Sequence, residues 1–278
     1  MLRGYTLKNA IIAKEMNGKI YVSCVQSVNL GGVPKGEKGS VNQKKLWESL
    51  KRSKKVVQEI LLCNQWEYFG TITFSKEKVK DRYAVQETIK TLRVWLNNYK
   101  KRQAPDLKYC LIPELHKDGA VHLHGCFSGI PEKDLKPFSE YDKETIRIND
   151  WEKLAKLQYC NFLPLATKFG RNSFGKINSS EGTAHYCSKY ISKDMVSAVQ
   201  EINLHTYYAS QGLKRAERIG IYDYKCDSVA RLQWDWQGSY VDEETGEIIE
   251  TCTYKKTFAD KKTFQLWLKL NNIDLVQE

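Results

Sequence analysis

The stretch HKDGAVHLHG, residues His116–Gly125, holds three of the five histidines in the chain. His122 and His124 are two residues apart, which puts both imidazoles on the same face of a β-strand. The preceding Lys117–Gly119 predicts a hairpin turn, and a three-residue loop with its glycine in the left-handed conformation places Glu114 opposite His122. A two-residue loop would put Glu114 on the other face, so the grouping of these three side chains depends on the register.

Two imidazoles and one carboxylate bind a divalent metal and leave open coordination positions for a substrate oxygen. The His-x-His pattern alone also fits histidines that pack in a core or face solvent. The carboxylate of Glu114, eight residues before His122 and across a glycine-containing turn, strengthens the metal interpretation. Both interpretations stay open, with Glu114, His122 and His124 as the candidate ligands.

A second chemical signal lies in HYCSKYISK, residues 185–193. On a helix Tyr186 and Tyr190 are one turn apart on one face, and Lys189 and Lys193 repeat the same offset. The tyrosines could simply pack on a sheet while the lysine ammonium groups reach solvent. Alternatively a phenol is a nucleophile. With a pKa near 10 only about a thousandth of it is ionised at pH 7, so attack on a phosphodiester needs an ammonium or a metal nearby.

The overall charge predicts an acidic partner. The 278 residues carry a formal net charge of +11, and the pI is about 9.1. Nucleic acid is the commonest partner of such a chain, although a basic protein can also be merely soluble. Apolar residues at helical spacing over 43–63 leave a lysine- and arginine-rich opposite face, and a basic, turn-like stretch follows residue 205. The candidate DNA-phosphate contacts are Lys51, Arg52, Lys54, Lys55, Lys214, Arg215 and Arg218.

Several function classes are disfavoured by the composition. The eight cysteines are spread singly without a CxxC or CxxH pair, which argues against a zinc knuckle and suits reduced thiols in a cytoplasm. The N-terminal stretch lacks the apolar core of a signal peptide, and no run reaches the length of a transmembrane span. No GxxxxGK[ST] phosphate loop occurs. We therefore expect a cytoplasmic protein with no membrane partner.

The pattern along the chain is one of alternating helices and strands. We expect an N-terminal extension over 1–40, a catalytic domain over 41–205 and a C-terminal subdomain over 206–278. Within the middle region, periodicity and capping residues predict helices over 43–63, 82–100 and 183–202, the last capped by Thr183, and strands over 67–74, 107–114 and 120–128.

Three segments together resemble the HUH endonucleases that initiate rolling-circle replication. YFGTITF at 68–74 resembles the strand motif of that family, and VHLHG at 121–125 resembles its His-hydrophobic-His motif. AHYCSKYISK at 184–193 resembles the tyrosine helix in its two-tyrosine form, as in the gene A initiators of small single-stranded DNA phages. Tyr186 stands in YCSK, which resembles the single-tyrosine motif of circovirus initiators. The family often takes its third metal ligand about eight residues before the first histidine, where Glu114 stands.

The resemblance implies an α+β fold. Its core would be a mostly antiparallel, ferredoxin-like sheet of about five strands with helices packed on one face, plus small N- and C-terminal additions. It also implies an endonuclease and strand transferase that nicks single-stranded origin DNA with Mg²⁺ or Mn²⁺ as cofactor. A tyrosine, Tyr186 or Tyr190, would form a 5′-phosphotyrosine link and release a free 3′-OH, with Lys189 and Lys193 assisting, and the strand would later be rejoined.

The absence of the helicase domain found in eukaryotic viral initiators points to a bacterial plasmid or phage element, with a host helicase as a candidate partner. Two other interpretations stay open. A related transposase or mobilisation relaxase would share the chemistry, although conjugative relaxases carry a third histidine that only His116 could supply. A non-catalytic nucleic-acid-binding module on a ferredoxin-like sheet would need neither the histidine pair nor the tyrosines.

Overall fold

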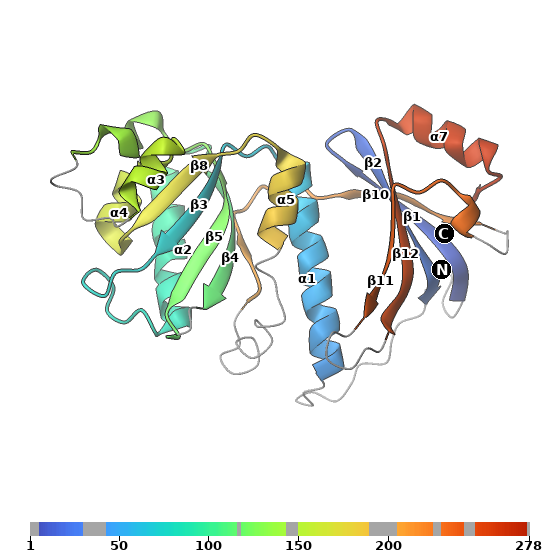
Figure 1. The fold of residues 1–278 in the computed structure, drawn as a ribbon, viewed down its shortest axis with the longest axis horizontal. Helices are drawn as coiled ribbons and strands as arrows, with labels where there is room; N and C mark the ends of the chain where they lie inside the picture. Colours follow the sequence, from blue (N-terminus) through green and yellow to red (C-terminus); the bar gives the residue numbers. More distant parts are fainter. Residues whose placement is uncertain are drawn as a thin grey trace. The chain divides into compact units, whose positions relative to one another are not determined.

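The computed structural model describes residues 6–29, 43–115, 118–142, 150–188, 205–224, 229–241 and 248–276 (Figure 1). The chain divides into two compact units. The central unit is Val41–Lys214, and the terminal unit combines Met1–Ser40 with Arg215–Glu278. Among the described residues, no helix is long and apolar enough to cross a membrane.

The central unit is built on an antiparallel sheet of seven strands, which confirms the expected α+β class but exceeds the five strands predicted. The hairpin of the opening motif lies inside this sheet and not at its edge. In spatial order the strands are β6 (Leu135–Pro137), β7 (Cys160–Phe162), β8 (Asn172–Lys176), β3 (Tyr68–Thr73), β5 (Val121–Ser128), β4 (Lys108–Leu115) and β9 (Tyr208–Ala209).

One face of this sheet is covered by α2 (Val85–Arg102). The helix buries a stripe that includes Ile89 and Leu92, and these pack in one cluster with Leu123 and Phe127 of β5. Its three basic residues at the C-terminal turn complement the negative end of the helix dipole. The four predicted elements over 67–128 are therefore observed, each within a few residues of its expected bounds.

The opposite face is covered by α1 (Gln43–Cys63) and α5 (Ser180–Ser188), which pack against each other. Because strand side chains alternate between faces, Ile112 and Cys126 join this second cluster while their strand neighbours join the first. The expectation of helices on one face is therefore wrong. The central strands carry apolar residues at both parities, so each face needs a covering layer.

Helix α5 begins earlier than expected. Ser179 precedes the first turn, and its hydroxyl accepts a hydrogen bond from the backbone N–H of Gly182 at 3.1 Å. Thr183, predicted as the cap, lies inside the helix and donates its hydroxyl to the Ser179 carbonyl at 2.7 Å. The rest of the predicted helix, from residue 189 to 202, lies outside the described residues.

Two short helices, α3 (Trp151–Lys156) and α4 (Leu163–Phe169), accompany the β6–β8 edge of the sheet. Phe169 of α4 packs in the same cluster as α2. Two short 3₁₀ helices flank β6, η1 (Glu132–Asp134) before it and η2 (Phe138–Glu140) after it.

The terminal unit has its own antiparallel sheet of six strands. Strand β1, near the N-terminus, pairs with β10 from the C-terminal part of the chain, so residues distant in sequence form one sheet. Helix α7 (Lys261–Leu270) is capped by Asp260 and buries Phe264 against that sheet. In spatial order the strands are β11 (Trp236–Val241), β12 (Ile248–Phe258), β2 (Lys19–Asn29), β1 (Thr6–Met16), β10 (Glu217–Asp223) and β13 (Asp274–Leu275), with the 3₁₀ helix η3 at Val229–Arg231.

Candidate active site

The β4–β5 hairpin has the register on which the predicted site depends. Glu114 pairs with His122, and Ile112 pairs with His124. Gly119 in the turn has φ +83, the left-handed conformation expected there. Directly opposed residues of an antiparallel pair share a face, so Glu114, His122 and His124 lie on one side of the sheet. This is the side covered by α1 and α5.

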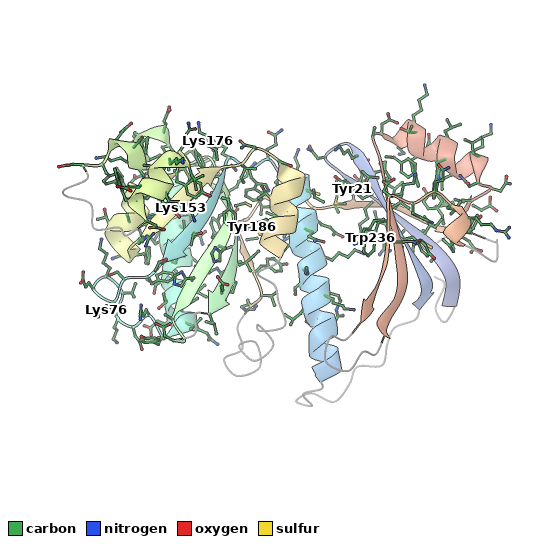
Figure 2. The ribbon with its side chains drawn as sticks, in the orientation of Figure 1. Tyr21, Lys76, Lys153, Lys176, Tyr186 and Trp236 are labelled. Atoms are coloured by element: carbon green, nitrogen blue, oxygen red, sulfur yellow. The ribbon has the colours of Figure 1, made fainter. Side chains whose placement is uncertain are left out.

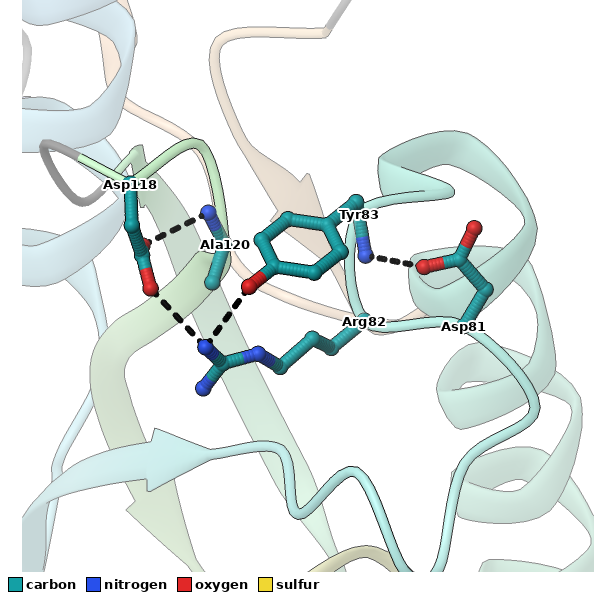
Figure 3. A network of polar contacts seen from close by, with 5 residues as sticks. All are labelled: Asp81, Arg82, Tyr83, Asp118 and Ala120. Carbon is teal, nitrogen blue, oxygen red and sulfur yellow. Dashed lines mark hydrogen bonds and ion pairs between the residues drawn. The ribbon is translucent and has the colours of Figure 1, made fainter.

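The tip of the hairpin is tied to the segment before α2 (Figure 3). The Asp118 carboxylate accepts the backbone N–H of Ala120 at 3.0 Å and a guanidinium N–H of Arg82 at 2.9 Å. The same nitrogen of Arg82 donates to the hydroxyl of Tyr83 at 2.8 Å, and this contact raises the pKa of Arg82 further. These contacts hold the turn that sets the register.

Strand β3 supplies a hydroxyl partner for each imidazole. Thr71 lies opposite His124 and Thr73 opposite His122. The Thr71 hydroxyl is 3.2 Å from Nδ1 of His124, and the Thr73 hydroxyl is 3.1 Å from Nδ1 of His122. No role was assigned to these threonines from the sequence, although the alternation T-I-T in a predicted strand was the available signal.

The carboxylate of Glu114 contacts the ring of His124. Its Oε2 lies 2.6 Å from Nε2 of that ring. The His124 side chain is 11% exposed, whereas that of Glu114 is 46% exposed, so the pair sits where the face opens towards solvent. Within the part of the chain that the structure describes, no group of three or more His, Cys, Asp or Glu side chains is gathered as a metal-binding cluster. The three candidate ligands thus share a face, and the closest contact among them is that of Glu114 with His124.

Helix α5 presents Tyr186 on the same face of the sheet (Figure 2). Ala184 and Cys187 are buried, while Tyr186 is 45% exposed. The Tyr186 ring meets Phe69 edge-on, with ring centroids 5.2 Å apart. Phe69 in turn stacks with His124, with centroids 6.1 Å apart and the planes within 8°. One aromatic ring of β3 therefore contacts both the candidate nucleophile and a candidate metal ligand.

A pair of cysteines seats α5 on the sheet. The Sγ atoms of Cys187 and Cys126 are 3.5 Å apart, and both side chains are fully buried. The hydrogen bond with Cys187, together with burial, raises the pKa of Cys126 well above its usual value. The pair thus consists of neutral thiols that pack as small apolar groups.

A small hollow adjoins Tyr186. It has a volume of about 250 Å³ and is lined by the rings of Phe69 and Tyr159, by Tyr186 itself, and by polar residues of the segment leading into α5, among them Asn178 and Thr183. Sequence reasoning missed Tyr159, which is nearly thirty residues from the tyrosine helix and carries no motif of its own.

The other predicted residues are distributed more widely. Tyr190, Lys189, Lys193 and His116 lie outside the described residues. Lys51, Arg52, Lys54 and Lys55 are on α1, with Arg52 and Lys55 exposed. Lys214 is exposed at the end of the central unit, while Arg215 and Arg218 are exposed in the terminal unit. The proposed phosphate contacts are thus shared between two units.

Residues 67–195 match a family of replication-associated proteins, described under the name ORF2. No curated protein and no solved structure matches the chain. The matched region contains β3, the β4–β5 hairpin and α5, which together form the site. The match supports a replication-initiator family for this region and associates it with DNA replication.

Proposed function

We propose that the central unit is a single-strand DNA endonuclease that nicks and rejoins a replication origin by tyrosine transesterification. One observation carries the proposal: Tyr186 of α5 and the Glu114, His122 and His124 side chains lie on one face of one sheet, with Phe69 touching both parts. The family match favours replication over the transposase and relaxase alternatives.

The donor set fits a divalent metal, Mg²⁺ or Mn²⁺. With each Nδ1 beside a threonine hydroxyl, Nε2 is the nitrogen of each ring left for a metal. Two ligands at right angles around such an ion lie roughly 3 Å apart, since each bond is about 2.1 Å long. The 2.6 Å separation of Glu114 Oε2 and His124 Nε2 is close to this value, so the ion would take the place of a proton between them. When bound, it would polarise the scissile phosphate and stabilise charge that develops there.

The chain's own residues supply the nucleophile and its placement. The phenol oxygen of Tyr186 forms a bond to phosphorus while the bond from phosphorus to the 3′-oxygen breaks. The phenol proton passes to solvent, and the 3′-oxygen takes up a proton to become a free 3′-OH. One phosphoester replaces another, so the reverse reaction rejoins the strand without an energy source. Tyr190, one helical turn further along, would act as the second nucleophile, with Lys189 and Lys193 assisting.

The test uses end-labelled single-stranded oligonucleotides with Mn²⁺ and a denaturing gel. A 3′-labelled strand should transfer its label to the protein, because the protein becomes attached to the 5′-phosphate of the downstream fragment. A 5′-labelled strand should give only a shorter free strand. Chelation of the metal should abolish both products.

Phenylalanine substitutions identify the nucleophile, because they remove the hydroxyl and little volume. We expect Tyr186→Phe and Tyr190→Phe each to retain some cleavage and the double variant to retain none. Tyr141→Phe, at a tyrosine that stacks on Phe138 elsewhere in the unit, serves as the matched control and should be fully active. A covalent adduct formed by the double variant would refute the assignment of this helix.

A further inference from the structure

The hollow beside Tyr186 has the composition of a binding site for a planar, polar-edged ring. Three aromatic side chains line it, those of Phe69, Tyr159 and Tyr186. Asn178, on the segment before α5, adds an amide that can both donate and accept hydrogen bonds. Among the described residues that line it, none is acidic. At about 250 Å³ it is smaller than the pockets that enclose drug-sized ligands and suits a single heterocycle.

The position of Tyr159 depends on a glycine. Phe69 of β3 pairs with Gly175 of β8, so both positions face the α5 side of the sheet. A side chain at Gly175 would bring its Cβ to 2.6 Å from Cε1 of Tyr159. The missing side chain therefore lets the Tyr159 ring lie against the backbone of β8, beside Phe69. Rings from two segments far apart in sequence are thereby placed on one wall.

We propose that this hollow holds an unpaired nucleobase of the DNA strand next to the phosphate that Tyr186 attacks, with the base stacked on Tyr159. The inference rests on the proposed function, because Tyr186 belongs to both sites. Stacking on aromatic side chains is the usual way in which single-stranded DNA is held, since every base has an apolar face. The polar edge of the base would meet Asn178, which would make this hollow a place where the sequence at the nick is read.

The test is a binding measurement that needs neither metal nor cleavage. Fluorescence anisotropy would compare a labelled oligothymidylate with an abasic strand of the same length, in the presence of chelator. Tyr159→Leu should weaken binding of the oligothymidylate roughly 5- to 150-fold, the loss of one base–aromatic stack, and leave binding of the abasic strand unchanged. Tyr159→Phe keeps the ring and should bind within about twofold of the original protein. Lys90→Gln, at an exposed lysine of α2 on the other face of the sheet, is the control for general charge effects.

A second measurement uses the unchanged protein and is independent of the folding of any variant. An oligonucleotide that contains 5-iododeoxyuridine crosslinks on irradiation to aromatic side chains that it stacks upon. Trypsin should then release the crosslinked peptide 157–168, which contains Tyr159. Crosslinks confined to other peptides, or equal affinity of Tyr159→Leu for the oligothymidylate, would overturn the proposal. If no covalent protein–DNA adduct formed with Mn²⁺ while the binding loss persisted, the nicking function would fail and the nucleobase site would stand.

Discussion

Replacing Thr71 and Thr73 by valine tests whether the β3 hydroxyls prepare the imidazoles for a metal. Valine keeps the branched shape that suits a strand and removes only the hydroxyl. Each change deletes one contact to a ring, at 3.2 Å for His124 and 3.1 Å for His122. The ring would lose its fixed orientation and its preferred tautomer, while the strand pairing would remain.

The magnitude follows from the two contacts. A hydrogen bond of this kind contributes about 1 kcal/mol, and loss of a partner that orients a metal ligand typically lowers metal affinity 10- to 100-fold. We expect each single variant to bind Mn²⁺ about 10-fold more weakly and the double variant about 100-fold more weakly. The rate of adduct formation at limiting Mn²⁺ should fall in parallel and recover at saturating Mn²⁺.

Isothermal titration calorimetry with Mn²⁺ measures the affinities, and thermal melts followed by circular dichroism check the fold. Thr167→Val is the matched control, because it removes a hydroxyl that donates to the Leu163 carbonyl at 2.9 Å on the exposed surface of α4. If the double variant bound Mn²⁺ as tightly as the original protein, the threonines would be packing residues and the reasoning from the ring contacts would be refuted.

Three further predictions concern the carboxylate, the hairpin tip and a buried thiol. Glu114→Gln keeps a hydrogen-bonding group beside His124 but removes the charge, so calorimetry should show Mn²⁺ affinity at least about 10-fold lower with an unchanged melting temperature; unchanged affinity would remove Glu114 from the ligand set. Arg82→Gln should lower the free energy of unfolding by less than about 1 kcal/mol, since the Asp118 contact is exposed, yet hydrogen exchange should be faster in the hairpin turn than in the original protein; equal exchange would mean that the contact does not restrain the turn. Burial raises the pKa of the Cys24 thiol to about 12 from its usual value of 9.0, so between these two pH values only the unfolded state ionises and the free energy of unfolding falls by up to about 1.4 kcal/mol per pH unit. In Cys24→Ala the urea midpoint should therefore decline less from pH 9 to pH 11, and an identical decline would contradict this assignment.

Local features of the sequence were sufficient to predict the hairpin and its register. The turn chemistry of Lys117–Gly119 and the two-residue spacing of His122 and His124 act over a few residues, so no distant contact is needed to place Glu114 opposite His122. The helices over 43–63 and 82–100 were predictable for the same reason, because their apolar stripes repeat with the helical period.

Tertiary structure alone decided what surrounds the hairpin. Thr71 and Thr73 contact the histidines across about fifty residues of sequence, and Tyr159 reaches the hollow because a glycine on another strand makes room for it. Likewise β1 and β10 pair from opposite ends of the chain to build the terminal unit. A hydrophobic pattern specifies that a face must be buried but not which segment will bury it. Partners brought together by chain closure over long loops therefore remain hidden until the sheet order is known.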